Sequence, residues 1–82
     1  MHLSLYYTRT CPFCIRVLLA LKGLNVNVEL RNLSGNRELR SELIANGGKS
    51  QVPCLKITEG NKDRWLYESA DIIRFLKQLD AR

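Results

Sequence analysis

Two cysteines separated by two residues are the side chains in this sequence best suited to redox chemistry. They lie in the segment Thr10-Cys11-Pro12-Phe13-Cys14, directly after an apolar run and directly before a stretch with helical periodicity. At a strand-to-helix junction of this kind, the first cysteine meets unpaired backbone N–H groups and the positive end of the helix dipole. Both favour a thiolate over a thiol. We therefore expect Cys11 to be the nucleophile.

The second cysteine, Cys14, lies three residues further along the predicted helix. That spacing brings it onto the same face as Cys11, close enough to form a disulfide with Cys11 or to attack a mixed disulfide formed there. Pro12 fits the first helical position, where its missing N–H is not needed, and so helps to fix the junction. We expect Cys14 to be the resolving thiol.

Spacing alone leaves two other roles open for this pair. A two-residue separation is also typical of zinc ligands, but the remaining candidates, Cys54 and His2, belong to no paired ligand motif. We therefore expect no metal site. Inert core cysteines are the second alternative, and it is the one we favour for Cys54, which lies in a predicted strand. The proline inside the motif favours the redox role for the pair.

Length, cysteine count and hydropathy restrict the class of protein. With 82 residues the chain is long enough for one core, and we expect residues 1–82 to form a single domain. Three cysteines cannot all pair, which argues against a structural disulfide framework and for a reducing compartment. No segment resembles a secretory leader or reaches the length of a membrane span. The sequence predicts a soluble, cytoplasmic protein that does not bind membranes.

The formal charge of +5 and the pI near 9.5 predict a surface that attracts anions. The basic residues are scattered from Arg9 to Arg82 without a dense run, and the few aromatic residues form no RNA-binding pattern. We therefore expect no nucleic-acid partner. A small anionic substrate or an acidic protein suits this charge better.

Apolar periodicity and turn residues predict seven secondary-structure elements. In chain order these are a strand at 1–7, a helix between Pro12 and Gly23, an edge strand at 26–31, a helix at 34–48, strands at 52–57 and 64–67 joined by a turn at 59–62, and a helix at 69–79. The order is β-α-β-α-β-β-α. An opening parallel βαβ unit followed by a hairpin and a closing helix predicts an α/β fold, in which a four-stranded mixed sheet has helices on both faces.

Two of these elements carry specific burial predictions. In the edge strand, Val26, Val28 and Leu30 alternate with polar residues, which predicts one buried face. The apolar stripe predicted for the second helix consists of Leu39, Leu43 and Ile44.

The element order and three short motifs resemble the thioredoxin-like superfamily, and within it the glutaredoxins and the N-terminal domain of glutathione transferases. Residues 11–14 (Cys-Pro-Phe-Cys) resemble the glutaredoxin active site, with phenylalanine where tyrosine is usual. Residues 51–53 (Gln-Val-Pro) resemble the segment that carries the cis-proline. Residues 67–72 (Tyr-Glu-Ser-Ala-Asp-Ile) resemble the glutamyl-binding turn of glutathione transferases and related glutaredoxins.

The resemblance implies a dithiol glutaredoxin, a glutathione-dependent thiol–disulfide oxidoreductase with Cys11 and Cys14 as its catalytic residues. The implied glutathione-binding residues are Gln51, Val52, Pro53, Glu68 and Ser69. A cis bond before Pro53 is implied as well, with the main chain there pairing with the cysteinyl part of glutathione. Glutathione is then a co-substrate, and no metal or organic cofactor is expected. The expected partners are glutathione and glutathionylated or disulfide-containing proteins, and the chain is expected to be a monomer.

Several departures from the family leave alternatives open. Thr8 stands where glutaredoxins usually have a lysine, with Arg9 beside it as an electrostatic substitute. The residue that would hold the glycyl carboxylate of glutathione is open among Arg9, Arg40 and Lys49. A glutathione-ligated iron–sulfur module and a non-catalytic glutathione-binding domain remain alternative functions. Because a transferase would continue into an all-helical domain and the sequence ends at Arg82, conjugation of electrophiles is not expected.

Overall fold

The computed structural model describes residues 1–81, and its elements follow the predicted order. They are β1 (His2–Tyr7), α1 (Pro12–Lys22), β2 (Glu29–Asn32), α2 (Arg37–Gly47), β3 (Cys54–Glu59), β4 (Lys62–Leu66) and α3 (Ser69–Asp80). No helix within residues 1–81 is both long enough and apolar enough to cross a membrane.

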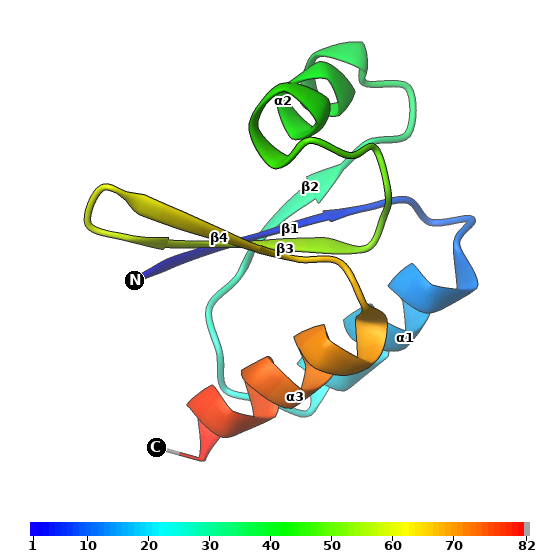
Figure 1. The fold of residues 1–82 in the computed structure, drawn as a ribbon. Coiled ribbons are helices and arrows are strands. Elements are labelled where there is room, and N and C mark those ends of the chain that lie inside the picture. The colour runs from blue at the N-terminus through cyan, green and yellow to red at the C-terminus, as the bar shows by residue number, and fades with distance from the viewer. Residues whose placement is uncertain (82) are drawn as a thin grey trace.

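The four strands form one mixed sheet in the order β2-β1-β3-β4. Strand β1 pairs in parallel with β2 and antiparallel with β3, and β3 pairs antiparallel with β4. Helices α1 and α3 cover one face of the sheet and α2 covers part of the other (Figure 1). The α/β fold with helices on both faces is therefore as predicted.

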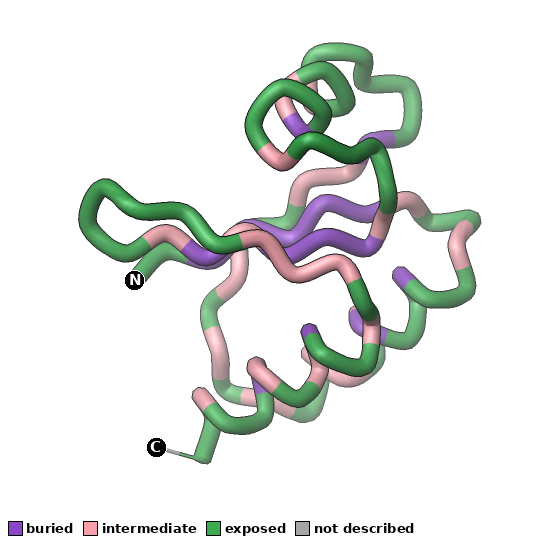
Figure 2. The backbone as a smooth tube through the Cα atoms, in the orientation of Figure 1, coloured by how far each residue is buried: buried purple, intermediate pink, exposed green. Residues whose placement is uncertain are grey.

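Side-chain alternation along the central strands builds a core on each face of the sheet. The larger core lies between the sheet and helices α1 and α3, and consists of Leu3, Leu5, Tyr7, Cys14, Val17, Leu55, Ile57, Ile72 and Leu76. The smaller core lies on the α2 side and consists of Tyr6, Leu33, Leu43 and Cys54. The buried centre of the sheet is formed by β1 and β3, whereas the β3–β4 hairpin turn is exposed (Figure 2).

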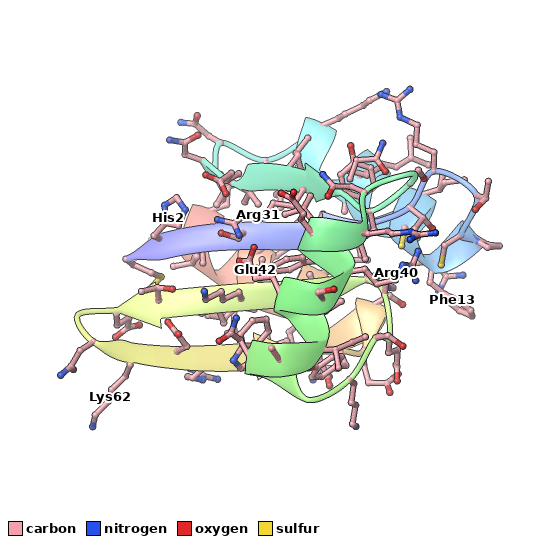
Figure 3. All side chains as sticks on the ribbon, turned by 90° about the horizontal axis from the view of Figure 1, so that it is seen from above. His2, Phe13, Arg31, Arg40, Glu42 and Lys62 are labelled. Carbon is pink, nitrogen blue, oxygen red and sulfur yellow. The ribbon has the colours of Figure 1, made fainter. Side chains whose placement is uncertain are left out.

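Helix α2 is held to the sheet by one buried leucine and a polar cluster. Leu43 is fully buried, whereas Ile44, predicted in the same stripe, is 48% exposed, so that prediction is wrong. The Tyr6 hydroxyl donates a hydrogen bond of 2.8 Å to Glu42 Oε1, and Arg31 Nη1 donates one of 2.5 Å to the same oxygen. Figure 3 shows Arg31 and Glu42 together above the sheet. The helix therefore contacts the sheet through a narrower apolar stripe than predicted.

The predicted edge strand at 26–31 is shorter and begins later, because pairing with β1 starts only at Glu29. Val26 and Val28 pack against the larger core before the strand begins, as their alternation predicted. Leu30 is 51% exposed, contrary to the prediction, since the helices cover the two central strands more fully than this edge strand.

The hairpin strands are also displaced from their predicted ends. Strand β3 begins at Cys54 rather than residue 52, and β4 ends at Leu66 rather than residue 67. Val52, Pro53 and Tyr67 therefore lie outside the strands, where they line a pocket described below.

Candidate functional site

The predicted nucleophile lies at the start of α1, where the sequence placed it. Cys11 occupies the N-cap position with extended backbone angles (φ −91°, ψ 119°), and Pro12 is the first helical residue. The first helical hydrogen bond runs from the Ile15 N–H to the Cys11 carbonyl oxygen, at 3.0 Å. The N–H groups of the first turn are therefore directed toward the Cys11 side, where a thiolate can use them.

The two thiols of the pair have opposite pKa shifts. Burial acts to raise the pKa of Cys11, but hydrogen bonds from the backbone N–H and thiol of Cys14 and from the N–H of Phe13 lower it below its ordinary value. Cys14 is fully buried, and this burial raises its pKa to about 11 despite hydrogen bonding with Thr8. At neutral pH the pair therefore combines a thiolate-forming cysteine with a neutral thiol, as a nucleophile and a resolving residue require.

The third cysteine lies in the smaller core, on the face of the sheet away from Cys14. Burial raises the pKa of Cys54 to about 12, and a hydrogen bond with Tyr67 lowers it only in part. Cys54 is therefore a neutral buried residue, in agreement with the core position predicted for it.

A pocket of about 130 Å³ lies next to the nucleophile. Cys11 Sγ is 3.9 Å from the Val52 carbonyl oxygen, and the Val52–Pro53 bond is cis, as the resemblance implied. The pocket is lined by Phe13, Gln51, Val52, Pro53, Tyr67, Glu68 and Ser69. The structure thus brings together all five residues predicted to bind glutathione. Figure 3 shows Phe13 at the end of the sheet opposite Lys62 of the hairpin.

One wall of the pocket is the N-terminus of α3. Glu68 occupies the N-cap position, and its carbonyl oxygen accepts the first helical bond from the Ile72 N–H at 2.9 Å. Within residues 1–81 no side chain caps this end, so Ser69 begins the helix without acting as its cap. The N–H groups of Ser69, Ala70 and Asp71 precede the first intrahelical bond and are available to an anionic group in the pocket.

Sequence reasoning missed the contribution of Tyr67. Its hydroxyl donates a hydrogen bond of 2.6 Å to the Gly47 carbonyl oxygen, and Lys49 Nζ lies 5.1 Å from the centre of its ring. The only sequence signal was that Tyr67 begins the motif at residues 67–72. Of the other basic candidates, Arg9 lines a separate groove between α1 and β2, and Arg40 is an exposed residue of α2.

The opposite pKa shifts predict selective alkylation. At neutral pH, iodoacetamide is expected to modify Cys11 and to leave Cys14 and Cys54 unmodified. The rate of Cys11 alkylation should rise with pH and reach its plateau at a lower pH than that of an ordinary thiol, because the pKa of Cys11 is lowered. Peptide mass spectrometry over a pH series measures both effects. In denaturant, the alkylation rates of all three thiols should follow pH profiles with the midpoint of an ordinary cysteine. If the midpoint for Cys11 is the same in the native and the denatured protein, the assignment of Cys11 as the low-pKa thiol is wrong.

Residues 5–82 match the family described as glutathione S-transferase, N-terminal domain. Because this match spans almost the whole sequence, the chain belongs to that family, and its fold is thioredoxin-like. No curated protein sequence matches the chain significantly.

Solved structures of similar fold fall into two groups. A trimeric glutathione transferase from Leishmania is 26% identical, with a TM-score of 0.77 over 96% of this chain and 18% of its own. A maleylacetoacetate isomerase from Anaeromyxobacter dehalogenans, solved with glutathione in its active site, is 27% identical, with a TM-score of 0.61 over 99% and 38%. A thioredoxin-like protein is 23% identical, with a TM-score of 0.69 over 94% and 97%. The chain therefore spans less than half of the two enzymes and nearly all of the thioredoxin-like protein.

Proposed function

We propose that this protein is a glutathione-dependent thiol–disulfide oxidoreductase of the dithiol glutaredoxin type. One observation carries the proposal: the sulfur of Cys11 lies 3.9 Å from the Val52 carbonyl oxygen, at the edge of a pocket lined by main-chain and helix-terminal groups. A cysteine with a lowered pKa beside this pocket suits thiol exchange with a small thiol ligand.

The chemistry of the pocket favours glutathione. The free N–H groups at the start of α3 suit the glutamyl carboxylate, and the exposed carboxylate of Glu68 suits the neighbouring ammonium group. In this proposal the Val52 main chain pairs with the cysteinyl residue, which brings its sulfur to Cys11; the short distance between Cys11 Sγ and the Val52 carbonyl oxygen supports it. Membership of a glutathione transferase domain family and the bound glutathione of the related isomerase support this choice.

Among the three basic candidates, we assign the glycyl carboxylate to Lys49. Its ammonium group lies 5.1 Å from the ring of Tyr67, which itself lines the pocket. Arg9 lines the groove between α1 and β2 instead and is not among the groups that lower the pKa of Cys11.

The reaction then takes two exchanges at Cys11. The thiolate attacks the glutathionyl sulfur of a mixed disulfide, which forms a Cys11–glutathione disulfide and releases the other partner as a thiol. A second glutathione thiolate attacks this intermediate, regenerates the Cys11 thiolate and leaves as oxidised glutathione. With a protein disulfide, the Cys11 thiolate first forms a mixed disulfide with the substrate. Cys14 then attacks the Cys11 sulfur, which releases the substrate as a dithiol and leaves a Cys11–Cys14 disulfide. Two glutathione molecules reduce this disulfide by two further exchanges and leave as oxidised glutathione. Glutathione is the co-substrate, and these steps need no metal or organic cofactor.

Turnover of a glutathione mixed disulfide tests this function. The protein is mixed with a cysteine–glutathione disulfide, reduced glutathione, glutathione reductase and NADPH, and NADPH consumption is followed. We expect a rate that saturates with the mixed disulfide and depends on glutathione. A rate equal to that without protein, measured on protein whose Cys11 is reduced and alkylatable, would rule out the proposed function.

The α3 end of the pocket gives a smaller prediction. Ser69→Ala removes a hydroxyl but leaves the backbone donors, so we expect the KM for glutathione to rise roughly two- to tenfold, the effect of one hydrogen bond. Stability should change little, because the side chain makes no cap bond there. Ser41→Ala, at an exposed position of α2, is the control and should leave the KM unchanged. A stability loss of about 1 kcal/mol at unchanged KM would instead make Ser69 a structural cap.

A further inference from the structure

Two chain segments distant in sequence form two walls of the pocket. One wall is the loop that leaves α2 and contributes Gln51, Val52 and Pro53. The other is the junction between β4 and α3, which contributes Tyr67 and the two residues after it. The hydrogen bond of 2.6 Å from the Tyr67 hydroxyl to the Gly47 carbonyl oxygen joins this junction to the last residue of α2. The spacing of the walls thus depends on a contact between Tyr67, which lines the pocket, and Gly47, which does not.

Gly47 is fitted to this contact by its lack of a side chain. A Cβ atom at Gly47 would overlap the Tyr67 hydroxyl and lie 3.0 Å from Trp65 Cε3. Any larger residue must therefore displace the tyrosine ring or the tryptophan. The next residue, Gly48, has φ +82°, a conformation that favours glycine, and turns the chain from α2 into the loop. The two glycines have separate roles: Gly47 provides space, and Gly48 provides the turn.

The Tyr67 ring also contacts a charged side chain, that of Lys49, an exposed residue of the loop after α2. Lys49 Nζ lies 5.1 Å from the ring centre, within the range of a cation–π contact. The ordinary pKa of tyrosine already lies well above neutrality, and burial and the neighbouring Cys54 raise that of Tyr67 further, so its hydroxyl is protonated at neutral pH and donates to Gly47. The position of the ring therefore affects both the pocket wall and the lysine above it.

We propose that Gly47 and Tyr67 form a latch that fixes the width of the pocket and the position of Lys49, and that both are positioning residues for the ligand. This inference rests on the proposed function, since it takes glutathione as the ligand. The latch does not contact Cys11. It therefore affects the binding of glutathione and leaves the reactivity of the thiolate alone.

Tyr67→Phe tests the latch, because it removes the donor and keeps the ring. We expect the KM for glutathione to rise about three- to tenfold, as for the loss of one hydrogen bond, with a smaller change in kcat. The iodoacetamide rate of Cys11 should stay the same. Tyr7→Phe removes a hydroxyl from the core on the other face of the sheet and is the matched control, with no expected change in KM.

A double-mutant cycle separates the latch from a general loss of packing. Gly47→Ala alone should raise the KM more than Tyr67→Phe, because the new methyl group pushes the ring. In Gly47→Ala/Tyr67→Phe the overlapping hydroxyl is gone and only the close approach to Trp65 remains, so the KM should fall below that of Gly47→Ala toward that of Tyr67→Phe. An unchanged KM in Tyr67→Phe, or strictly multiplicative effects in the double variant, would overturn the latch.

The result also distinguishes the latch from the proposed function. If the unmodified protein shows no saturable dependence on glutathione, the function itself is wrong. If it shows that dependence and the KM is the same in Tyr67→Phe, only the latch is wrong.

Discussion

Replacement of Cys11 by serine is expected to reduce the turnover of a glutathione mixed disulfide to the uncatalysed rate. The lowered pKa of Cys11 makes its thiolate the attacking group, and a serine hydroxyl at the same helix start does not ionise at neutral pH. The coupled NADPH assay measures the loss. Cys54→Ala removes a thiol from the smaller core and is the control, with activity retained. Substantial turnover by the Cys11→Ser variant would place the nucleophile elsewhere.

Replacement of Cys14 by serine is expected to separate two reactions. Cys14 is buried with a pKa raised to about 11, so it acts only after a disulfide has formed at Cys11. Turnover of a glutathione mixed disulfide needs no second protein thiol and should persist. Reduction of a protein disulfide should fall by a factor on the order of ten or more, because the intramolecular exchange is lost.

Parallel assays with the two substrates on the same Cys14→Ser preparation measure this separation. An equal loss with both substrates would mean that Cys14 supports the structure of the site rather than resolving a disulfide. Thermal unfolding of the same preparation provides the control for stability.

The position of Cys11 between a strand and a helix could be predicted from the sequence, because the residues that determine it are neighbours in the chain. Cys11 lies in the short segment between an apolar strand and a stretch with a helical apolar pattern, and a proline at the first helical position follows it directly. The association of the cysteines with the two distant motifs came only from the resemblance to a family. Their meeting depends on the pairing of β3 with β1 and β4 and on the path of the loop before Pro53, which no local pattern specifies.

The predictions that were wrong or incomplete also concern contacts that no local pattern specifies. The alternation of apolar and polar residues correctly predicted that Val26 and Val28 face the core. It does not specify where pairing with β1 begins or how far the helices extend over Leu30. Similarly, residue 47 was predicted only as part of the helix at 34–48, whereas in the structure its lack of a side chain leaves room for the hydroxyl of Tyr67, twenty residues away. Contacts of this kind depend on tertiary structure and have no periodic signature.

The most direct test of the proposed chemistry is the intact mass of the Cys14→Ser variant after incubation with oxidised glutathione. We predict one glutathionyl adduct, located at Cys11 by peptide mapping and removed again by reduced glutathione. Without the resolving thiol this intermediate should accumulate, because only a second glutathione can release it. No adduct, or an adduct on Cys54 in place of Cys11, would contradict the assignment of this protein as a glutathione-dependent oxidoreductase.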